Sequence, residues 1–298
     1  MIAESATLRG DLRSDEPLAP YTSWRVGGPA DRYYRPADLA DLAAFLGQLD
    51  PAVPLLWLGL GSNLLVRDGG FRGVVVHTHG RLNVLERLDE SRIRAESGVP
   101  CAKVARFAGR HGLAGAEFLA GIPGTMGGAL AMNAGAFGGE TWERVVAVKT
   151  IDRRGSIRRR PRGDFEIGYR HVRMPEGEWF VAAELALEAG GDAERLTRGV
   201  RDLLARRGAS QPTGVPSCGS VFRNPEGDFA ARLIDAAGLK GLCIGGACVS
   251  EKHANFILNT GGATARDIEQ LIDTVRRRVR EAHDVELVPE VHIVGEPT

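Results

Sequence analysis

The feature that most constrains this sequence is the crowding of glycine into two short segments. The chain has 39 glycines among 298 residues, and two glycine-rich segments, 59–64 and 121–135, are the most informative. Each glycine loses more backbone freedom on folding than alanine does, at a cost of roughly 0.5–1 kcal/mol. Packing alone is a poor reason for so many in one place. Backbone without side chains can lie directly against a flat or phosphorylated ligand, so both segments are predicted to bind one.

The first segment follows an apolar run at 55–58 that predicts a strand. A dinucleotide-binding fingerprint would need its third glycine at Leu64, and the next apolar run begins too soon for a crossover helix. What fits is a tight turn whose N–H groups, helped by Ser62 and Asn63, suit a pyrophosphate. A glycine turn without a ligand is the alternative. The predicted cofactor-binding residues here are Gly59, Leu60, Gly61, Ser62, Asn63 and Leu64.

The second segment lies inside an uncharged stretch, 118–139, that is long enough to cross a bilayer. Its many glycines and Pro123 weaken a single helix, so a ligand-binding loop is the better interpretation. No lysine follows in the G-K-[ST] pattern, which excludes a P-loop NTPase. The predicted cofactor-binding residues here are Gly121, Ile122, Pro123, Gly124, Thr125, Gly127, Gly128, Ala129, Asn133 and Gly135.

Charge and cysteine usage narrow the class of protein further. Lys plus Arg and Asp plus Glu are both 38, and the pI is near 7.1, so no global field favours nucleic acid or anionic lipid. We predict no nucleic-acid partner, no membrane insertion and no metal site. The charged start of the chain is unlike a signal peptide, which predicts a cytoplasmic protein with reduced thiols. The cysteines are Cys101, Cys218, Cys243 and Cys248, without a CxxC pair.

The apolar and turn patterns mix helices with strands and show no regular βαβ repeat, which predicts an α+β fold. Asp38 and Thr264 have the sequence context of helix N-caps, the second with Asp267 as a capping box. The predicted helices are 39–49, 101–111, 193–207 ending before Gly208, 229–237 and one opening at Thr264. The predicted strands are 55–58, 73–77, a hairpin of 82–88 and 91–97, then 144–151, 179–187, 242–249, 254–259 and 286–294, with a linker at 210–217.

Short motifs in order over roughly residues 20–294 resemble the UDP-N-acetylenolpyruvoylglucosamine reductase family, also called UDP-N-acetylmuramate dehydrogenases. Each motif is weak by itself, and their order along nearly the whole chain makes the resemblance specific. The motifs are TSWRVGG at 22–28, GLGSNLLV at 59–66 with GFRG at 70–73, the second glycine segment through NAGAFG at 133–138, Tyr169-Arg170, GSVFRNP at 219–225, AGLKG at 237–241 with IGGA at 244–247, SEKHANF at 250–256 and PEV at 289–291.

The resemblance implies a vanillyl-alcohol-oxidase-type flavin fold, with FAD held between two α+β subdomains and a third α+β domain for the substrate. Neither glycine segment contains a histidine or cysteine, so the FAD is expected to be non-covalent. The implied borders are 1–79 with 285–298, then 80–208, then the substrate-binding domain at 209–284. A monomer that serves peptidoglycan precursor synthesis, and so the cell wall and cell division, is expected.

The resemblance also implies a two-stage reaction. NADPH reduces FAD and leaves; hydride then passes from flavin N5 to the methylene carbon of UDP-N-acetylglucosamine enolpyruvate, and the resulting enolate is protonated to give UDP-N-acetylmuramate. By family pattern Arg170 binds the carboxylate, Ser220 donates the proton and Glu290 is a third polar group. The implied substrate-binding residues are Asn224, Lys240 and His253.

Composition alone favours other interpretations of these residues. It makes Arg170 a solvated cation, Ser220 a turn or capping residue and Glu290 an exposed carboxylate on a strand. Cys218 is either a reactive thiol or, more simply, a buried inert one. No tyrosine occurs between His171 and Gly219, so the chain resembles the shorter family form that lacks a capping tyrosine loop.

Three alternatives of other kinds stay open at this stage. The nearest is an FAD-dependent sugar or hydroxy-acid oxidase on the same fold. A nonenzymatic nucleotide-binding protein could keep the glycine segments without the chemistry. A serine hydrolase is weaker, because the sequence has no G-x-S-x-G elbow.

Overall fold

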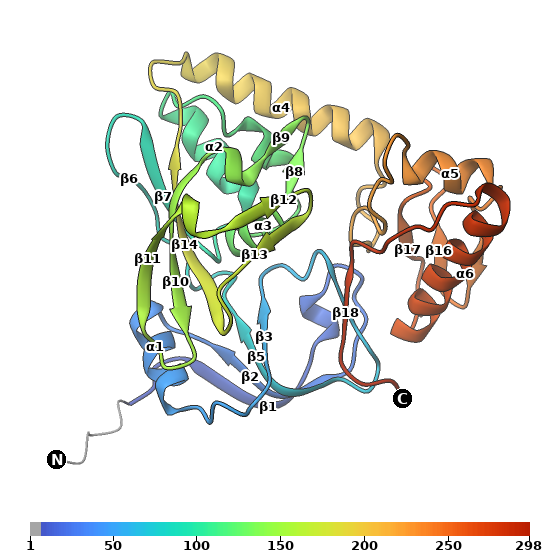
Figure 1. Cartoon of the computed structure of the whole chain (residues 1–298), viewed down its shortest axis with the longest axis horizontal. Helices are drawn as coiled ribbons and strands as arrows, with labels where there is room; N and C mark the ends of the chain where they lie inside the picture. The colour runs from blue at the N-terminus through green and yellow to red at the C-terminus, as the bar shows by residue number, and fades with distance from the viewer. Residues whose placement is uncertain (1–6) are drawn as a thin grey trace. The chain divides into compact units, whose positions relative to one another are not determined.

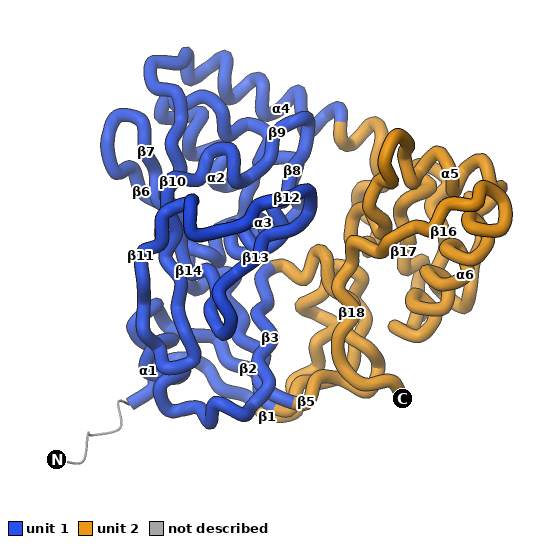
Figure 2. Tube along the Cα trace, in the orientation of Figure 1, with its two compact units in different colours: residues 1–13, 32–59, 73–206 blue, residues 14–31, 60–72, 207–298 orange. Residues whose placement is uncertain are grey.

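The computed structural model describes residues 7–298, which cluster into two compact units (Figures 1 and 2). Unit 1 comprises the chain up to Arg13 together with 32–59 and 73–206. Unit 2 comprises 14–31, 60–72 and 207–298. The chain therefore passes between the units several times, and neither unit is one continuous segment.

A five-stranded antiparallel sheet with the order β11-β10-β14-β7-β6 forms the larger core of unit 1. The predicted strands at 144–151 and 179–187 are its central pair, and the predicted hairpin is β6–β7. Side chains of α2 and α3 pack on this sheet around the fully buried Trp142. The elements are β6 (Leu85–Arg87), β7 (Arg92–Glu96), β10 (Val145–Asp152), β11 (Ile157–Pro161), β14 (Glu178–Ala186), α2 (Cys101–Arg110) and α3 (Met126–Met132).

A second sheet has the order β1-β2-β5-β3, in which β3 and β5 are parallel. The predicted first helix is confirmed, because the Asp38 carboxylate accepts a hydrogen bond from the Asp41 N–H at 2.9 Å. Its apolar face packs against buried valines of β5. The elements are β1 (Asp11–Pro17), β2 (Pro29–Arg35), α1 (Leu39–Gln48), β3 (Leu55–Leu58) and β5 (Phe71–His77).

The helix predicted at 193–207 extends further than expected. Gly208 keeps a helical backbone rather than a left-handed one, and the Gln211 N–H donates to the Arg207 carbonyl at 2.9 Å. A glycine ends a helix only where it adopts the left-handed conformation, so this one does not. The helix is α4 (Ala193–Ser210), and the remaining elements of 85–206 are η2 (Glu117–Gly121), β8 (Gly135–Ala136), β9 (Gly139–Glu140), η3 (Thr141–Glu143), η4 (Arg162–Asp164), β12 (Glu166–Gly168) and β13 (His171–Arg173).

Unit 2 is built around α6 (Ala265–His283), whose apolar residues recur with helical spacing and are buried. The predicted capping box is present, since Thr264 Oγ1 accepts from the Asp267 N–H at 3.1 Å and the Asp267 carboxylate accepts from the Thr264 N–H at 2.9 Å. The other elements are η1 (Ala19–Tyr21), β4 (Leu64–Val66), α5 (Ala230–Ala236), β15 (Cys243–Ile244), β16 (Ala247–Val249), β17 (Ile257–Asn259) and β18 (His292–Val294).

Three strand predictions in unit 2 were too long. In the predicted strand 254–259 only β17 pairs, because the chain first turns, with the Phe256 N–H donating to the His253 carbonyl at 3.0 Å. Residues 242–249 form a hairpin, β15–β16, because Gly245 at φ 54° turns the chain. In the predicted strand 286–294, only β18 pairs as a regular strand, in parallel with β4. The residues before β18 are held by single bridges, such as that between Phe222 and Pro289.

The uncharged stretch 118–139 is not one helix. It forms most of η2, a turn, the short α3, and the β8 strand that pairs with β9. This confirms the prediction that the stretch is not a single spanning helix. Within residues 7–298, no helix combines the length and the apolar character that crossing a membrane requires.

Candidate active site

The first glycine segment begins in contact with the second. A Cβ on Gly59, directly after β3, would overlap the side chain of Thr125, which is the N-cap residue of α3. The absence of a side chain at Gly59 therefore lets the two segments lie together within unit 1. Two residues that were selected separately in the sequence as cofactor-binding are neighbours in the fold.

The buried His77 holds the Gly59 carbonyl. Its Nε2 lies 2.9 Å from the Gly59 oxygen, and its Nδ1 is hydrogen-bonded to the Tyr33 hydroxyl. One neutral tautomer satisfies both bonds, with Nε2–H donating to Gly59 and Nδ1 accepting from Tyr33. Burial, assisted by the charge of Arg35 and by His79, lowers the pKa of His77 to about 4. The sequence gives no sign of this pair, because strand alternation does not show which polar residues of different strands face each other.

Acidification is expected to weaken the fold through His77. Its folded pKa of about 4 lies below the ordinary 6.5, so the unfolded state takes up the proton first. The stabilisation is present above about pH 6.5 and is lost as the pH falls toward about 4. Between about pH 7.5 and 5.5, the free energy of unfolding should fall by roughly 1 kcal/mol because of His77. Urea unfolding at both pH values measures it. In His77→Gln the extra loss should vanish; an equal loss in both proteins would contradict the assignment.

The rest of the first segment belongs to unit 2, and the shape of the turn accounts for most of its residue types. Gly61 has φ 59°, and a Cβ there would overlap the Tyr21 carbonyl. The Asn63 side chain donates from Nδ2 to the Glu290 carbonyl at 3.0 Å, so this bond ties the segment to a predicted catalytic residue. Leu64 opens β4, which confirms that no helix follows the turn.

The second segment contains glycines of two kinds. Gly121 lies against Phe137, and a Cβ on Gly127 would stand 2.9 Å from the Ser97 Cβ, so packing requires both. Gly128 is exposed, and a Cβ there would meet nothing within 4 Å. The protein's own packing does not require that glycine. The backbone at Gly128 is open to solvent, and the next residue, Ala129, is buried. This arrangement fits the flat cofactor predicted for this segment.

Arg170 lies on the second glycine segment and is not a freely solvated arginine. Its guanidinium donates to the Asn133 carbonyl at 3.4 Å and to the Gly135 carbonyl at 3.2 Å, and it stacks over the Tyr169 ring at 5.3 Å. The Asn133 side chain donates in turn to the Gly168 carbonyl at 3.1 Å. Arg170 has φ 53°, an uncommon conformation for a residue with a side chain. The fold thus joins a predicted catalytic residue to two predicted cofactor residues.

Ser220 and Glu290 belong to neighbouring segments of unit 2. The Glu290 N–H donates to the carbonyl of Val221, the residue after Ser220, at 2.7 Å. Burial, and secondarily the charge of Glu290, raises the pKa of Cys218 well above its ordinary value. A thiol so disfavoured as a thiolate is inert, which supports the simpler interpretation of Cys218. Ser220 itself is half-buried and follows Gly219 at φ 81°.

The predicted substrate residues have internal partners. Asn224 Oδ1 accepts from the Ala230 N–H at 3.1 Å, at the start of α5. Lys240 Nζ forms an ion pair with Asp235 at 2.8 Å. Burial, and to a smaller extent the charge of Lys240, lowers the pKa of His253. The structure pairs Lys240 with Asp235 and places Asn224 at a helix start.

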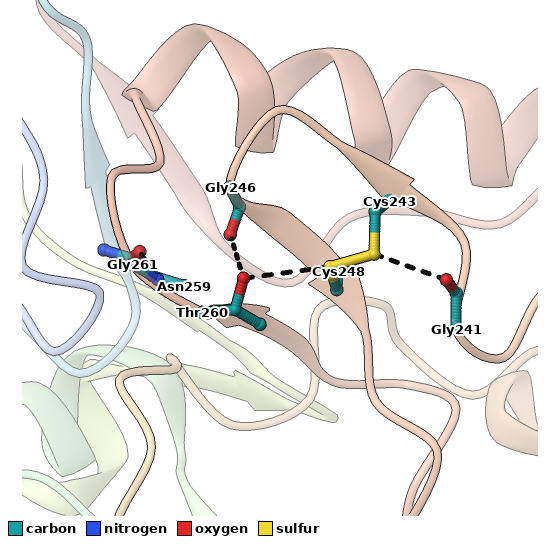
Figure 3. The surroundings of a disulfide bond; sticks show 7 residues. All are labelled: Gly241, Cys243, Gly246, Cys248, Asn259, Thr260 and Gly261. Atoms are coloured by element: carbon teal, nitrogen blue, oxygen red, sulfur yellow. Dashed lines mark hydrogen bonds between the residues drawn. A yellow bond between two sulfur atoms is a disulfide. The ribbon is translucent and has the colours of Figure 1, made fainter.

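The prediction that all four cysteines are reduced is wrong for two of them. Cys243 and Cys248 form a disulfide (Figure 3). They are direct partners across the β15–β16 hairpin, with their Cα atoms 4.1 Å apart. Facing cysteines on antiparallel strands are within bridging reach. The missed signal was their spacing around Gly245 and Gly246, which predicts a hairpin rather than a CxxC pair.

Thiol titration in denaturant is expected to find two thiols before reduction and four afterwards, since only Cys101 and Cys218 are free. In the native protein both should react slowly, because burial raises the pKa of Cys101 to about 12 and that of Cys218 well above its ordinary value. Closing so short a loop stabilises a fold by roughly 2 kcal/mol, which is the loss expected of a Cys243→Ser, Cys248→Ser variant. Four thiols without reductant would contradict the bridge.

Two further observations delimit the site. Within residues 7–298, no group of three or more His, Cys, Asp or Glu side chains could hold a metal ion. A surface hollow of about 570 Å³ opens at the start of α4, between residues such as Glu117, Arg195 and Asp202. None of the predicted site residues lines this hollow.

The fold and the paired glycine segments define an FAD-binding flavoprotein, and residues 30–160 match the family described as FAD binding domain. Residues 211–294 match the C-terminal domain of UDP-N-acetylenolpyruvoylglucosamine reductase. The chain belongs to the UDP-N-acetylenolpyruvoylglucosamine reductase family.

The similarity to members of this family extends over the whole chain. A reductase of that name from Alkalilimnicola ehrlichii is 63% identical over 99% of both chains. One from Methylococcus capsulatus is 62% identical over 98% of this chain and 96% of its own. The crystal structure of the enzyme from Thermus caldophilus superposes with a TM-score of 0.82 at 32% identity, covering 96% of this chain and 99% of that one.

These similarities confirm several expectations from the sequence. The protein is an enzyme, an NADP-dependent oxidoreductase of peptidoglycan precursor synthesis with FAD as cofactor and NADPH as reductant. Its fold mixes helices and strands, with an FAD-binding domain followed by the C-terminal domain of the reductase family. The oxidase, the nonenzymatic binding protein and the hydrolase are therefore not needed to explain the sequence.

Proposed function

We propose that this protein reduces UDP-N-acetylglucosamine enolpyruvate to UDP-N-acetylmuramate with NADPH. The observation that carries the proposal is the whole-length similarity to reductases named for that substrate, at 63% identity. When bound, FAD would take a hydride from NADPH and deliver one to the methylene carbon of the enolpyruvyl group. The chain's own residues would bind the cofactor and substrate, stabilise the enolate and supply the final proton.

The two glycine segments are proposed to hold FAD without a covalent link. The contact of Gly59 with Thr125 and the open backbone at Gly128 support this role. Gly61 and Asn63 would act mainly by shaping the first segment, since the Gly61 conformation and the Asn63 side chain serve the turn and its neighbour. For the domains we propose the borders expected from the family: 1–79 with 285–298, 80–208 and 209–284.

Arg170 is proposed to bind the substrate carboxylate. A guanidinium can form two parallel charge-assisted hydrogen bonds to a carboxylate, and these are stronger than bonds to neutral carbonyls. Its present acceptors, the carbonyls of Asn133 and Gly135, lie at 3.4 and 3.2 Å, so exchanging them for a carboxylate is favourable. Negative charge spreads onto the carboxylate as the enolate forms, and a fixed cation stabilises that charge.

Ser220 is proposed to protonate the enolate. Its O–H bond would break as a C–H bond forms at the carbon beside the carboxylate, and the serine would then regain a proton from solvent. Glu290 is the proposed third polar group, held next to the Ser220 segment by its N–H bond to Val221. A hydroxyl is a weak acid, but the enolate carbon is a strong base, so the transfer is feasible when both are correctly placed.

Asn224, Lys240 and His253 are proposed to contact the UDP-sugar. The Lys240–Asp235 ion pair has side chains 31% and 55% exposed, so exchanging its carboxylate for a pyrophosphate oxygen costs little. The neutral His253 can donate or accept a hydrogen bond without bringing further positive charge. A cytoplasmic monomer is the proposed working form.

An anaerobic absorbance experiment on the purified protein tests the proposal. Stoichiometric NADPH should bleach the flavin bands, and UDP-N-acetylglucosamine enolpyruvate should then restore them. If the bands return only when oxygen is admitted, the protein is an oxidase and the proposed substrate is wrong. A colourless protein that takes up no FAD would overturn the roles of both glycine segments.

A further inference from the structure

The segment that carries Ser220 is hydrogen-bonded along both of its edges within unit 2. On one edge, the Glu290 N–H donates to the Val221 carbonyl at 2.7 Å and the Arg223 N–H donates to the Val288 carbonyl at 2.9 Å. On the other edge, Val221 and Phe222 both bond to one residue, Asn255. Ser220 directly precedes these hydrogen-bonded residues, so its backbone position is constrained from the Val221 side.

Asn255 binds this segment with both its backbone and its side chain. Its carbonyl accepts from the Val221 N–H at 2.9 Å. Its side-chain Oδ1 accepts from the Phe222 N–H at 2.9 Å, and its Nδ2 donates to the Phe222 carbonyl at 2.8 Å. The side chain thus satisfies both main-chain polar groups of one residue, Phe222, as a neighbouring strand would.

The position of Asn255 is closed to solvent, with 3% of its surface exposed. Phe222, the residue it clamps, is 2% exposed. Water therefore cannot replace a missing partner easily, and the geometry depends on the amide itself. Only asparagine supplies a donor and an acceptor at this reach; aspartate keeps the acceptor and loses the donor, and leucine loses both.

The same residue also connects two predicted parts of the site. Asn255 lies two residues after His253, in a turn closed by the Phe256 N–H to the His253 carbonyl at 3.0 Å. The bonds of Asn255 to Val221 and Phe222 therefore fix the proposed substrate-binding turn relative to the Ser220 segment. On the opposite edge of the Ser220 segment, the Glu290 N–H donates to the Val221 carbonyl.

We propose that Asn255 is a positioning residue for the protonation step, acting through the backbone of 221–222 to hold the Ser220 hydroxyl in place. The inference rests on the proposed function, in which Ser220 donates the proton. Catalytic groups must be held within a fraction of an ångström, and misplacement by about 1 Å costs about 100-fold in rate. The loss should fall on the step that uses Ser220 and spare the step that does not.

The test uses the FAD-loaded Asn255→Asp variant, which is nearly isosteric and puts a carboxylate oxygen in place of the amide nitrogen that donates to the Phe222 carbonyl. Asn259→Asp is a matched control, because the Asn259 side chain also bonds backbone groups of unit 2, donating to the Trp24 carbonyl at 2.9 Å and accepting from the Gly261 N–H at 3.0 Å. Anaerobic stopped-flow absorbance measures flavin reduction by NADPH and flavin reoxidation by UDP-N-acetylglucosamine enolpyruvate separately, in water and in deuterium oxide.

In Asn255→Asp, reoxidation is expected to slow by roughly 10- to 100-fold with a larger solvent isotope effect, while reduction stays within about twofold of wild type. Asn259→Asp should keep both rates within about twofold. If Asn255→Asp fails to retain FAD, the same rates are measured in Asn255→Ser, whose hydroxyl can still donate.

A wild-type rate of reoxidation in Asn255→Asp, or in Asn255→Ser where that variant is used, would overturn the positioning role. Equal slowing of both half-reactions in Asn255→Asp, with the same slowing in Asn259→Asp, would also overturn it. Either result would leave the proposed function standing. A wild-type enzyme that the enolpyruvyl substrate cannot reoxidise would overturn both. The two failures are therefore distinguishable.

Discussion

Replacing Ser220 by alanine is expected to leave flavin reduction by NADPH within about twofold of wild type and to slow reoxidation by the enolpyruvyl substrate by roughly 10²- to 10⁴-fold. The first half-reaction needs no proton from Ser220, whereas the second ends with protonation of a carbon. That range corresponds to about 3–5 kcal/mol of lost transition-state stabilisation. Anaerobic stopped-flow absorbance of the flavin measures both stages in one preparation.

Two further variants separate the hydroxyl's chemistry from its packing. Ser217→Ala removes a similar hydroxyl from the same segment, where Ser217 is also half-buried, and should leave both rates unchanged. Ser220→Cys keeps a side-chain donor and should recover part of the second rate. If Ser220→Ala reoxidises as fast as wild type, another group donates the proton and the proposed role of Ser220 is wrong.

Sequence patterns were sufficient where structure is decided locally. The Asp38 cap and the Thr264–Asp267 capping box both form as predicted, because each depends on residues one helical turn apart. The same holds for the turn after β3, where Gly61 adopts the left-handed backbone that only glycine accepts cheaply. Such features need no knowledge of the rest of the fold.

Pairings between distant segments could not be predicted in this way. The packing of Gly59 on Thr125 and the two bonds of His77 depend on which strands become neighbours. Asn255 illustrates the same limit, since its motif was recognised but only His253 within it was selected. Nothing in the local sequence indicates that the Asn255 amide faces the backbone of Phe222.

The cysteines show how a general rule can override a local signal. Reduced thiols were expected because the sequence has no CxxC pair. The spacing of Cys243 and Cys248 around two glycines nevertheless predicts facing positions in a hairpin, and the structure bridges them. Hairpin register was the stronger guide here, because it fixes the distance between the two side chains.

Gly128→Leu is expected to abolish FAD binding while leaving the fold intact. Its backbone in α3 is helical and exposed, and an added Cβ would meet nothing within 4 Å. Leucine is also the better helix former, so the free energy of unfolding of the apoprotein should stay equal or increase by at most about 1 kcal/mol. A branched side chain standing where the cofactor must lie should weaken FAD at least about 100-fold, or roughly 2.7 kcal/mol.

The measurement combines FAD titration by flavin fluorescence with urea unfolding of the apoprotein. Gly199→Leu is the matched control, since Gly199 lies in α4 and its Cβ would likewise meet nothing within 4 Å, yet it belongs to neither glycine segment. Gly127→Ala should behave oppositely and destabilise the apoprotein, because its Cβ would stand 2.9 Å from the Ser97 Cβ. FAD bound normally by Gly128→Leu would show that the open face of α3 is not where the cofactor lies.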